Sequence, residues 1–182
     1  MKIKIRKWEL SDIDNLVQYA NNFQIARWLT NAFPHPYNRQ DGEFFIQSSS
    51  VQDPLTNFAI DVDNEAVGGI GLTVQTDIHC KNAEMGYWLA ESYWGKEIVP
   101  AAIQLIVDYG FKTFDINRIF ARPFGNNLKS QRVLEKSGFS LEARLEKTLY
   151  KNGEYMDEII YAIRNEAFTF GKPKNDDNAS SI

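Results

Sequence analysis

Three side chains could act as a general base, which accepts a proton during a reaction: Glu84, Asp157 and His79. A carboxylate does this work near neutral pH only where burial raises its pKa or where water molecules carry the proton. Glu84 lies on an expected strand, residues 83–89, that leads into a turn, so we rank it first and His79 second. An outward-facing strand position without a chemical role is the competing interpretation of Glu84.

Two turns join a strand pattern to a helix pattern and could position a ligand. The first, Tyr93-Trp94-Gly95-Lys96, precedes an expected helix over residues 97–114. Because the N-terminus of a helix exposes backbone N–H groups and the positive end of its dipole, this turn is a candidate anion site. The second turn precedes a helix that begins with Asn127 as its N-cap and ends at Gly138, which can take the left-handed closing conformation.

The elements that position these residues alternate between strand and helix patterns. Ser11 with Asp14 predicts a capping box, and Asn152-Gly153 predicts the turn of a hairpin. In order, we expect a strand around Ile3, helices after Ser11, near residues 24–30 and after Asn38, a hairpin of residues 57–62 and 66–74, the strand 83–89, the helix 97–114, a strand over 116–121, the helix after Asn127 and a last hairpin. This order predicts an α+β fold with a central, mixed, mostly antiparallel sheet.

The composition fits one globular domain and excludes several classes of protein. The chain has 182 residues, of which 43% are hydrophobic and 24% are charged, enough to bury a core. A net charge of −4 disfavours a general nucleic-acid binder, which is usually basic. With Cys80 as the one cysteine and only His35 and His79 as histidines, neither disulfides nor a metal site is expected. No segment has the pattern of a signal peptide or a membrane span, so we expect a cytoplasmic protein.

Four motifs in order resemble the GNAT superfamily of acetyl-CoA-dependent N-acetyltransferases. They are Ala83-Glu84-Met85-Gly86-Tyr87-Trp88-Leu89, then Tyr93-Trp94-Gly95-Lys96, then Asn127 through Phe139, and finally Asn152-Gly153 with Asp157. The likeness covers almost the whole chain and is nearest to the branch of the ribosomal-protein-alanine N-acetyltransferases and similar small-amine acetyltransferases. It implies a single GNAT domain over residues 1–170, with helices flanking a sheet that is splayed at the acetyl-CoA site. We expect residues 171–182 to form a polar, disordered tail.

The resemblance implies that acetyl-CoA binds where the two strand-to-helix turns meet. In the family the pyrophosphate contacts the backbone of the first turn, and the pantetheine arm pairs with the splayed strand. Carried over to this sequence, the acetyl-CoA contacts are Trp88, Leu89, Gly95, Lys96, Glu97, Ile98, Val99, Asn127 and Ser130. The alternative for Trp88 is an aromatic side chain packed in the core, and the alternative for Asn127 is a plain N-cap.

The same resemblance implies acetyl transfer to a primary amine by direct attack in a ternary complex. Glu84 is then the expected general base, and Ser130 the expected donor of a proton to the departing thiolate. A hydroxyl that only bonds the start of the helix is the other interpretation of Ser130. The acceptor, a protein N-terminus or a small-molecule amine, is expected to enter beside an aromatic segment that could equally be a core-packing loop. Its acceptor-binding residues would be Trp28, Phe33, His35 and Tyr37.

Three residues depart from the family's pattern and leave a second function open. Glu97 stands where a glycine is usual, Val99 stands where a small residue is usual, and Pro100 lacks an N–H that could bond phosphate. A catalytically weak module that binds CoA or serves as a scaffold is therefore the alternative to the enzyme. A homodimer joined through an edge of the last hairpin is a further expectation.

Overall fold

A computed structural model describes residues 1–165 of the chain. The strands are β1 (Ile3–Arg6), β2 (Asn57–Val62), β3 (Glu65–Val74), β4 (Asn82–Leu89), β5 (Arg118–Ala121), β6 (Ser140–Lys151) and β7 (Glu154–Arg164). The α-helices are α1 (Ile13–Ala20), α2 (Phe23–Ala26), α3 (Arg39–Ser50), α4 (Ile98–Thr113) and α5 (Leu128–Lys136). The predicted tail, residues 171–182, and the predicted end of the domain at residue 170 lie outside the described residues.

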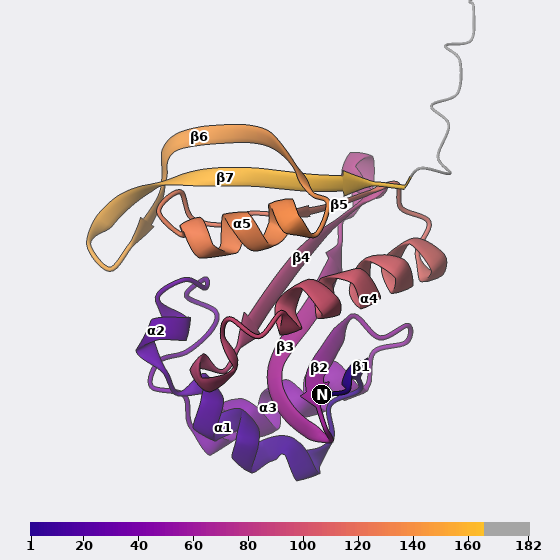
Figure 1. Ribbon diagram of the computed structural model, residues 1–182, viewed down its shortest axis with the longest axis vertical. Coiled ribbons are helices and arrows are strands. Elements are labelled where there is room, and N and C mark those ends of the chain that lie inside the picture. Colours follow the sequence, from indigo (N-terminus) through magenta and orange to yellow (C-terminus); the bar gives the residue numbers. More distant parts are fainter. Residues whose placement is uncertain (166–182) are drawn as a thin grey trace, which may run out of the picture.

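The strands of the described residues form one open sheet with the order β1-β2-β3-β4-β5-β7-β6 (Figure 1). Neighbouring strands are antiparallel, except that β4 and β5 run parallel. The predicted α+β fold with a mixed, mostly antiparallel sheet is confirmed.

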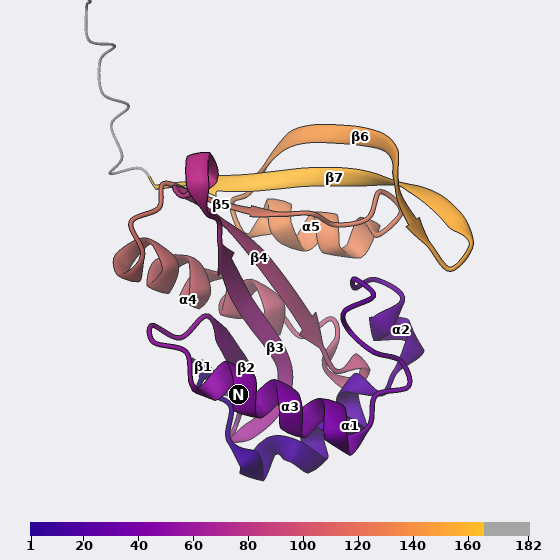
Figure 2. The ribbon, with the colours of Figure 1, turned by 180° about the vertical axis from the view of Figure 1, so that it is seen from behind.

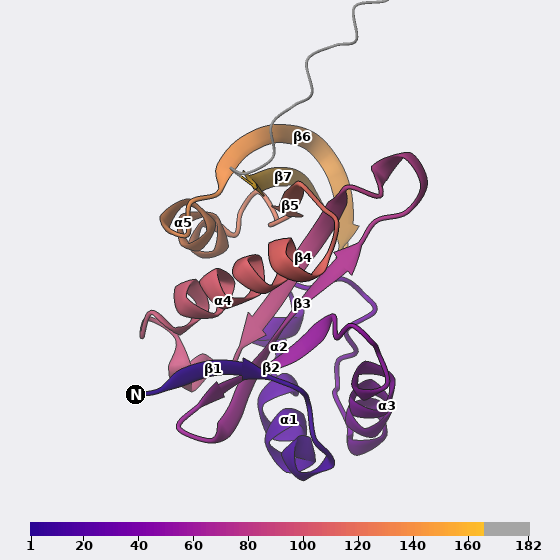
Figure 3. The same ribbon diagram turned by 90° about the vertical axis from the view of Figure 1, so that its right-hand side faces the viewer.

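Helices cover both faces of this sheet, with α1 and α3 on one face and α4 and α5 on the other (Figures 2 and 3). The alternation of side chains along each strand decides which residues meet which layer. In β2, Phe58 and Ile60 pack in a buried cluster with Ile103 of α4, whereas Ala59 between them packs with Leu16 of α1. Within residues 1–165, none of the helices has the length and apolar content needed to cross a bilayer.

The sheet is split between β4 and β5. The two strands pair at only three positions, the last of which joins Glu84 to Phe120. Beyond Glu84, β4 continues along β3 alone, and β4 and β5 diverge (Figure 1). The N–H of Ala90 donates to the carbonyl of Val67 in β3 at 2.8 Å. The backbone groups of successive residues in an antiparallel strand point alternately to the two sides of the strand. The backbone groups of Tyr87 and Leu89 therefore point away from β3 and into the gap.

Local sequence signals located several helix starts and turns correctly. Asn38 caps α3 by accepting a hydrogen bond from the N–H of Asp41 at 3.1 Å, and the Asp41 carboxylate accepts one from the N–H of Asn38 at 2.9 Å. The β6–β7 turn has φ values of 54° at Asn152 and 84° at Gly153. Both values are positive, as a tight two-residue hairpin turn requires.

The start of α1 differs from the prediction. A short 3₁₀-helix, Leu10–Asp12, precedes it, and the carboxylate of Asp12 accepts the N–H of Glu9 at 3.0 Å. The predicted capping box of Ser11 and Asp14 is therefore wrong, and Asp14 lies at the surface in an ion pair with α3. The helix expected near residues 24–30 is also shorter, since α2 ends at Ala26.

The strand β6 lies at an edge of the sheet and carries exposed apolar side chains. Leu141 and Tyr150 are 59% and 62% exposed. An unpaired strand edge can pair with a second copy of the same strand. Association of two chains through this hairpin stays a prediction.

Candidate functional site

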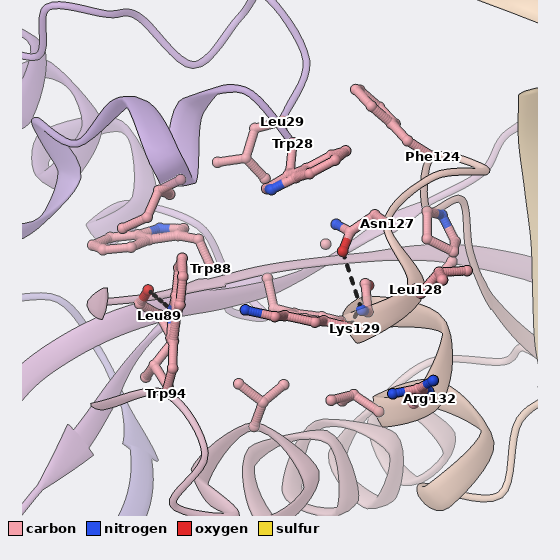
Figure 4. Close-up of a pocket in the computed structure, with 18 of the residues that line it drawn as sticks. Trp28, Leu29, Trp88, Leu89, Trp94, Phe124, Asn127, Leu128, Lys129 and Arg132 are labelled. Carbon is pink, nitrogen blue, oxygen red and sulfur yellow. Dashed lines mark hydrogen bonds between the residues drawn. The ribbon is translucent and has the colours of Figure 1, made fainter. Parts of the chain in front are cut away.

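A pocket of about 800 Å³ opens at the gap between β4 and β5 (Figure 4). Its walls come from β4, the turn before α4, the first turns of α4 and α5, and the segment after α2. The volume is that of a small-molecule site. All nine residues predicted to contact the cosubstrate line this pocket, namely Trp88, Leu89, Gly95, Lys96, Glu97, Ile98, Val99, Asn127 and Ser130. Their contacts with a ligand stay predictions.

The start of α4 is uncapped. Gly95 has a φ of 74°, and Glu97, the N-cap, has a φ of 59° and a ψ of 17°, which is the left-handed conformation. That conformation costs a residue other than glycine about 1–2 kcal/mol. The side chain of Glu97 makes no hydrogen bond to the first turn, so the N–H groups of Ile98 and Val99 have no capping partner from it. Both groups remain available to an anion.

The carboxylate of Glu97 does not face this anion site unpaired. It accepts a hydrogen bond from the ammonium of Lys136, on the last turn of α5, at 2.5 Å. Both side chains are exposed, so the pair is screened by water and salt. Glu97 therefore occupies the backbone conformation that a glycine would adopt, while its negative charge is turned toward a cation.

The start of α5 is capped. The Oδ1 of Asn127 accepts the N–H of Ser130 at 3.2 Å, as predicted for an N-cap. The Oγ of Ser130 lies 2.7 Å from the hydroxyl oxygen of Tyr87, and either hydroxyl can donate. Burial raises the pKa of Tyr87 to about 12, an effect that the hydrogen bond to Ser130 offsets in part. Both hydroxyl groups are therefore protonated near neutral pH.

Tyr87 also lies at this site. It belongs to the sequence motif of residues 83–89 but was not among the predicted site residues. Side chains alternate along β4, so Tyr87 packs with the cluster under α4, while Trp88 packs with the cluster under α1. Glu84 and Trp88 are four positions apart in β4, so their side chains lie on the same face of the strand, opposite to that of Tyr87. Because the sheet is split here, Glu84 and Ser130 still line one pocket.

The carboxylate of Glu84 is held by a neighbouring guanidinium. The Nε and Nη2 of Arg122 donate to its two oxygens at 2.9 and 2.8 Å. Arg122 also lies 3.3 Å from a carboxylate oxygen of Glu158. The hydrogen bond to Glu84 raises the pKa of Arg122 above its ordinary value.

The other two candidate bases do not line the pocket. His79 is exposed in a 3₁₀-helix, Asp77–His79, before β4. Asp157 accepts the N–H of Lys147 at 3.0 Å and the Nε of Arg144 at 2.8 Å, and these bonds lower its pKa. Within the described part of the chain, no three His, Cys, Asp or Glu side chains gather as a metal site. The absence of a metal stays a prediction.

The four predicted acceptor residues are not brought together. Trp28 lines the main pocket, edge-on to Phe124 with ring centroids 6.2 Å apart. Phe33 and His35 line a second, smaller cavity. Tyr37 is 5% exposed in the core, where burial raises its pKa to about 12. Of these four, only Trp28 is placed to meet a ligand in the main pocket.

The two ends of the pocket differ in chemistry. Basic side chains gather where α4 and α5 begin: Lys96, Lys129, Arg132 and Lys136. At the other end Trp28, Leu29 and Phe124 present apolar surfaces (Figure 4). Between them, the indole N–H of Trp94 donates to the carbonyl of Leu89 at 2.8 Å, and the ammonium of Lys129 lies 5.3 Å from the ring centroid of Trp94. This arrangement suits an elongated ligand with an anionic end.

Comparison with known proteins agrees with this arrangement. The family described as Acetyltransferase (GNAT) domain matches residues 2–140 of the chain. By sequence, the chain is 27% identical to the spermidine N(1)-acetyltransferase of Escherichia coli (strain K12) over 167 residues, which cover 88% of this chain and 85% of that protein.

Two solved structures are similar in both fold and sequence. The Microcin C7 self immunity acetyltransferase MccE, in complex with acetyl-CoA and AMP, has a TM-score of 0.76 and 27% identity, covering 90% of this chain and 93% of that chain. The ribosomal-protein-S5-alanine acetyltransferase from Vibrio fischeri has a TM-score of 0.75 and 26% identity, covering 93% of this chain and 96% of that chain.

Proposed function

This chain belongs to the GNAT acetyltransferase family and is an acetyl-CoA-dependent N-acetyltransferase, and we propose that it acetylates a primary amine by direct attack in a ternary complex. Acetyl-CoA, when bound, supplies the acetyl group as a thioester. The observation that carries the proposal is the pocket itself, which places Ser130 and Glu84 on either side of one gap in the sheet.

The pocket fits the cosubstrate in size, charge and backbone. The uncapped N–H groups of Ile98 and Val99, with Lys129 and Arg132 nearby, suit phosphate groups. The backbone groups of Tyr87 face the gap, where an extended amide-containing arm could pair with them like an added strand. Pro100 removes one N–H from the first turn, and the basic side chains compensate for that loss.

Ser130, with Tyr87 behind it, is the group that we assign to protonate the departing thiolate. A serine hydroxyl alone is a weak acid, but the 2.7 Å contact lets the Tyr87 hydroxyl donate a hydrogen bond to the Ser130 oxygen as Ser130 gives up its proton, which water then replaces. This assignment makes Ser130 a catalytic residue and Tyr87 a positioning residue. The competing interpretation was a hydroxyl that only bonds the start of α5, but the Ser130 hydroxyl contacts Tyr87, and it is the backbone N–H of Ser130 that bonds Asn127.

Glu84 is the group that we assign to receive the proton of the attacking amine. An unperturbed α-amine has a pKa of about 8, so a substantial fraction is already neutral near physiological pH and the base has little to do. Because each oxygen of the Glu84 carboxylate already accepts a hydrogen bond from Arg122, we expect the proton to reach Glu84 through a water molecule.

Bisubstrate kinetics test the proposed reaction. Initial rates of thiol release would be measured while both acetyl-CoA and an acceptor are varied, and the acetylated product would be identified by mass. Direct attack predicts lines that intersect in a double-reciprocal plot. Parallel lines, together with an acetylated form of the protein, would show a covalent acyl-enzyme instead.

The alternative, a catalytically weak module that only binds CoA or a partner, depended on Glu97, Val99 and Pro100. The pairing of Glu97 with Lys136 weakens that argument, because the carboxylate is not left opposite a phosphate. Calorimetry separates the cases, since tight CoA binding without acceptor-dependent thiol release would favour the module. A cytoplasmic location, a homodimer and the absence of nucleic-acid binding stay predictions.

A further inference from the structure

A second cavity of about 290 Å³ shares Arg27 with the main pocket. It lies between the segment around α2 and the turn of the β6–β7 hairpin, which face each other (Figure 2). Its polar lining consists of Arg27, Asn31, His35, Lys151 and Asn152, and no aspartate or glutamate lines it. In a chain whose net charge is −4, this is a local concentration of positive charge and hydrogen-bond donors.

The basic groups of this cavity lie against the α2 segment. The guanidinium carbon of Arg27 lies 5.9 Å from the ring centroid of Phe23, and the ring of His35 lies 5.7 Å from the same ring. The ammonium of Lys151 donates to the carbonyl of Ala26 at 2.7 Å and to the carbonyl of Leu29. Lys151 is thereby fixed beside Arg27, although the two residues are far apart in the sequence.

The positive charge of Lys151 has carbonyl partners only. A partly buried ammonium without a carboxylate is costly, and burial lowers the pKa of Lys151. A carboxylate or phosphate placed in the cavity would offset this cost through charge-assisted hydrogen bonds, which are stronger than neutral ones. The cavity is therefore suited to an anionic group of a ligand.

The main pocket offers no free carboxylate to a second ammonium group. Glu84 and Glu97 are its acidic lining residues, and each is ion-paired, with Arg122 at 2.8 Å and with Lys136 at 2.5 Å. An acceptor with a second positive charge, such as a polyamine, would meet Arg27 instead. Because like charges repel, we expect the site to disfavour this class of acceptor.

We propose that the acceptor is an amine that also carries a carboxylate or phosphate, and that this anionic group binds in the second cavity beside Arg27, Lys151 and His35. The inference rests on the proposed acetyl transfer and names the class of acceptor for it. Arg27 and Trp28 are adjacent, with the guanidinium carbon 4.8 Å from the indole centroid, so one molecule can extend from the main pocket past Trp28 into the cavity.

A matched set of acceptors tests the inference. Aminohexanoate, aminohexyl phosphate, aminohexanol and diaminohexane each carry a primary amine on an unbranched six-carbon chain and differ in the group at the other end. Each would be titrated calorimetrically into the protein saturated with CoA, so that binding is measured without turnover. We expect the two anionic acceptors to bind roughly tenfold more tightly than aminohexanol, and diaminohexane to bind most weakly. The better of the two anionic acceptors identifies the preferred group.

Two variants complete the test. Arg27 is exposed, so Arg27→Glu should fold normally and should abolish or reverse the preference for the anionic acceptors. Lys7→Glu makes the same change of charge at an exposed residue that lines neither cavity and should keep the preference. Equal affinities across the set, including no measurable binding of any member, or a preference unchanged in Arg27→Glu, would overturn the inference. Failure of the proposed function appears separately, as the absence of thiol release from acetyl-CoA while the binding preference persists.

Discussion

The helices α4 and α5 both begin at the pocket, but they begin in opposite ways. At α5, the side chain of Asn127 bonds the N–H of Ser130, so one of the helix's exposed donors is satisfied from within the chain. At α4, Glu97 takes a left-handed conformation, and its carboxylate pairs with Lys136 instead of the first turn. Helix termini need partners for their donors. The closed start of α5 serves to place a hydroxyl, whereas the open start of α4 suits an anionic ligand.

The largest expected effect tests whether the closed start has a chemical role. Ser130→Ala keeps the backbone N–H that Asn127 caps but removes the hydroxyl, so we expect turnover to fall by up to about 10²-fold with little change in CoA affinity or melting temperature. Turnover, CoA affinity and melting temperature would be measured on one preparation. Tyr87→Phe, which keeps the ring, should cause a smaller loss. Wild-type turnover in the folded Ser130→Ala variant would end the catalytic assignment.

The next effect tests whether the open start is an anion site. Arg132→Glu should raise the dissociation constant of CoA by roughly tenfold at low salt, and less at high salt, because the charge lies near the expected phosphate groups. Isothermal titration at two salt concentrations measures this. Lys7→Glu is the control for the change in net charge. An affinity equal to that of the control would remove Arg132 from the binding site.

A smaller effect, on the free energy of unfolding, tests the cap at the start of α5. Asn127→Ala should lower the free energy of unfolding by about 1 kcal/mol, because the capped N–H loses its partner. Urea denaturation without CoA measures this, and Asn127→Asp, which keeps an acceptor oxygen, should retain most of the stability. We also expect CoA affinity to fall by more than the stability does. If CoA affinity is unchanged in the Ala variant, Asn127 is a cap alone.

The smallest effect concerns the strained residue of the open start. Glu97→Gly should relieve about 1 kcal/mol of backbone strain, offset in part by loss of the exposed ion pair with Lys136. CoA binding should tighten a few-fold, since Lys136 becomes free to meet phosphate. Glu97→Gln keeps the backbone strain and removes only the charge. Should both variants bind CoA as the wild type does, Glu97 has no influence on the site.

The contrast between the two termini also explains what the sequence could predict. The cap of α5 joins residues three positions apart, so its signal lies within the helix itself. The start of α4 was predicted from the helix pattern of residues 97–114, which is also a local signal. The left-handed conformation of Glu97 was not, because nothing local favours it in a glutamate, and its partner Lys136 lies on another helix.

The residues that complete the site depend on the sheet rather than on neighbours in the chain. Tyr87 meets Ser130 across 43 positions, and Arg122 meets Glu84 across 38. Both contacts require β5 to lie parallel beside β4 and α5 to return over the gap. The period-two pattern of β4 could have placed Tyr87 on the correct face, but no local pattern identifies its partner. The error at Ser11 has a different origin, since the bond there is local but is made by Asp12, which accepts the N–H of Glu9, rather than by Ser11.

The short pairing of β4 with β5 gives a bound ligand a place to stabilise the fold. This three-position seam has the fewest paired positions of any two neighbouring strands in the described sheet, and it borders the pocket. A ligand bound there stabilises the folded chain by about 2.7 kcal/mol when its concentration is 100 times its dissociation constant. We expect a bound ligand to make the seam open less often and to slow proteolysis there.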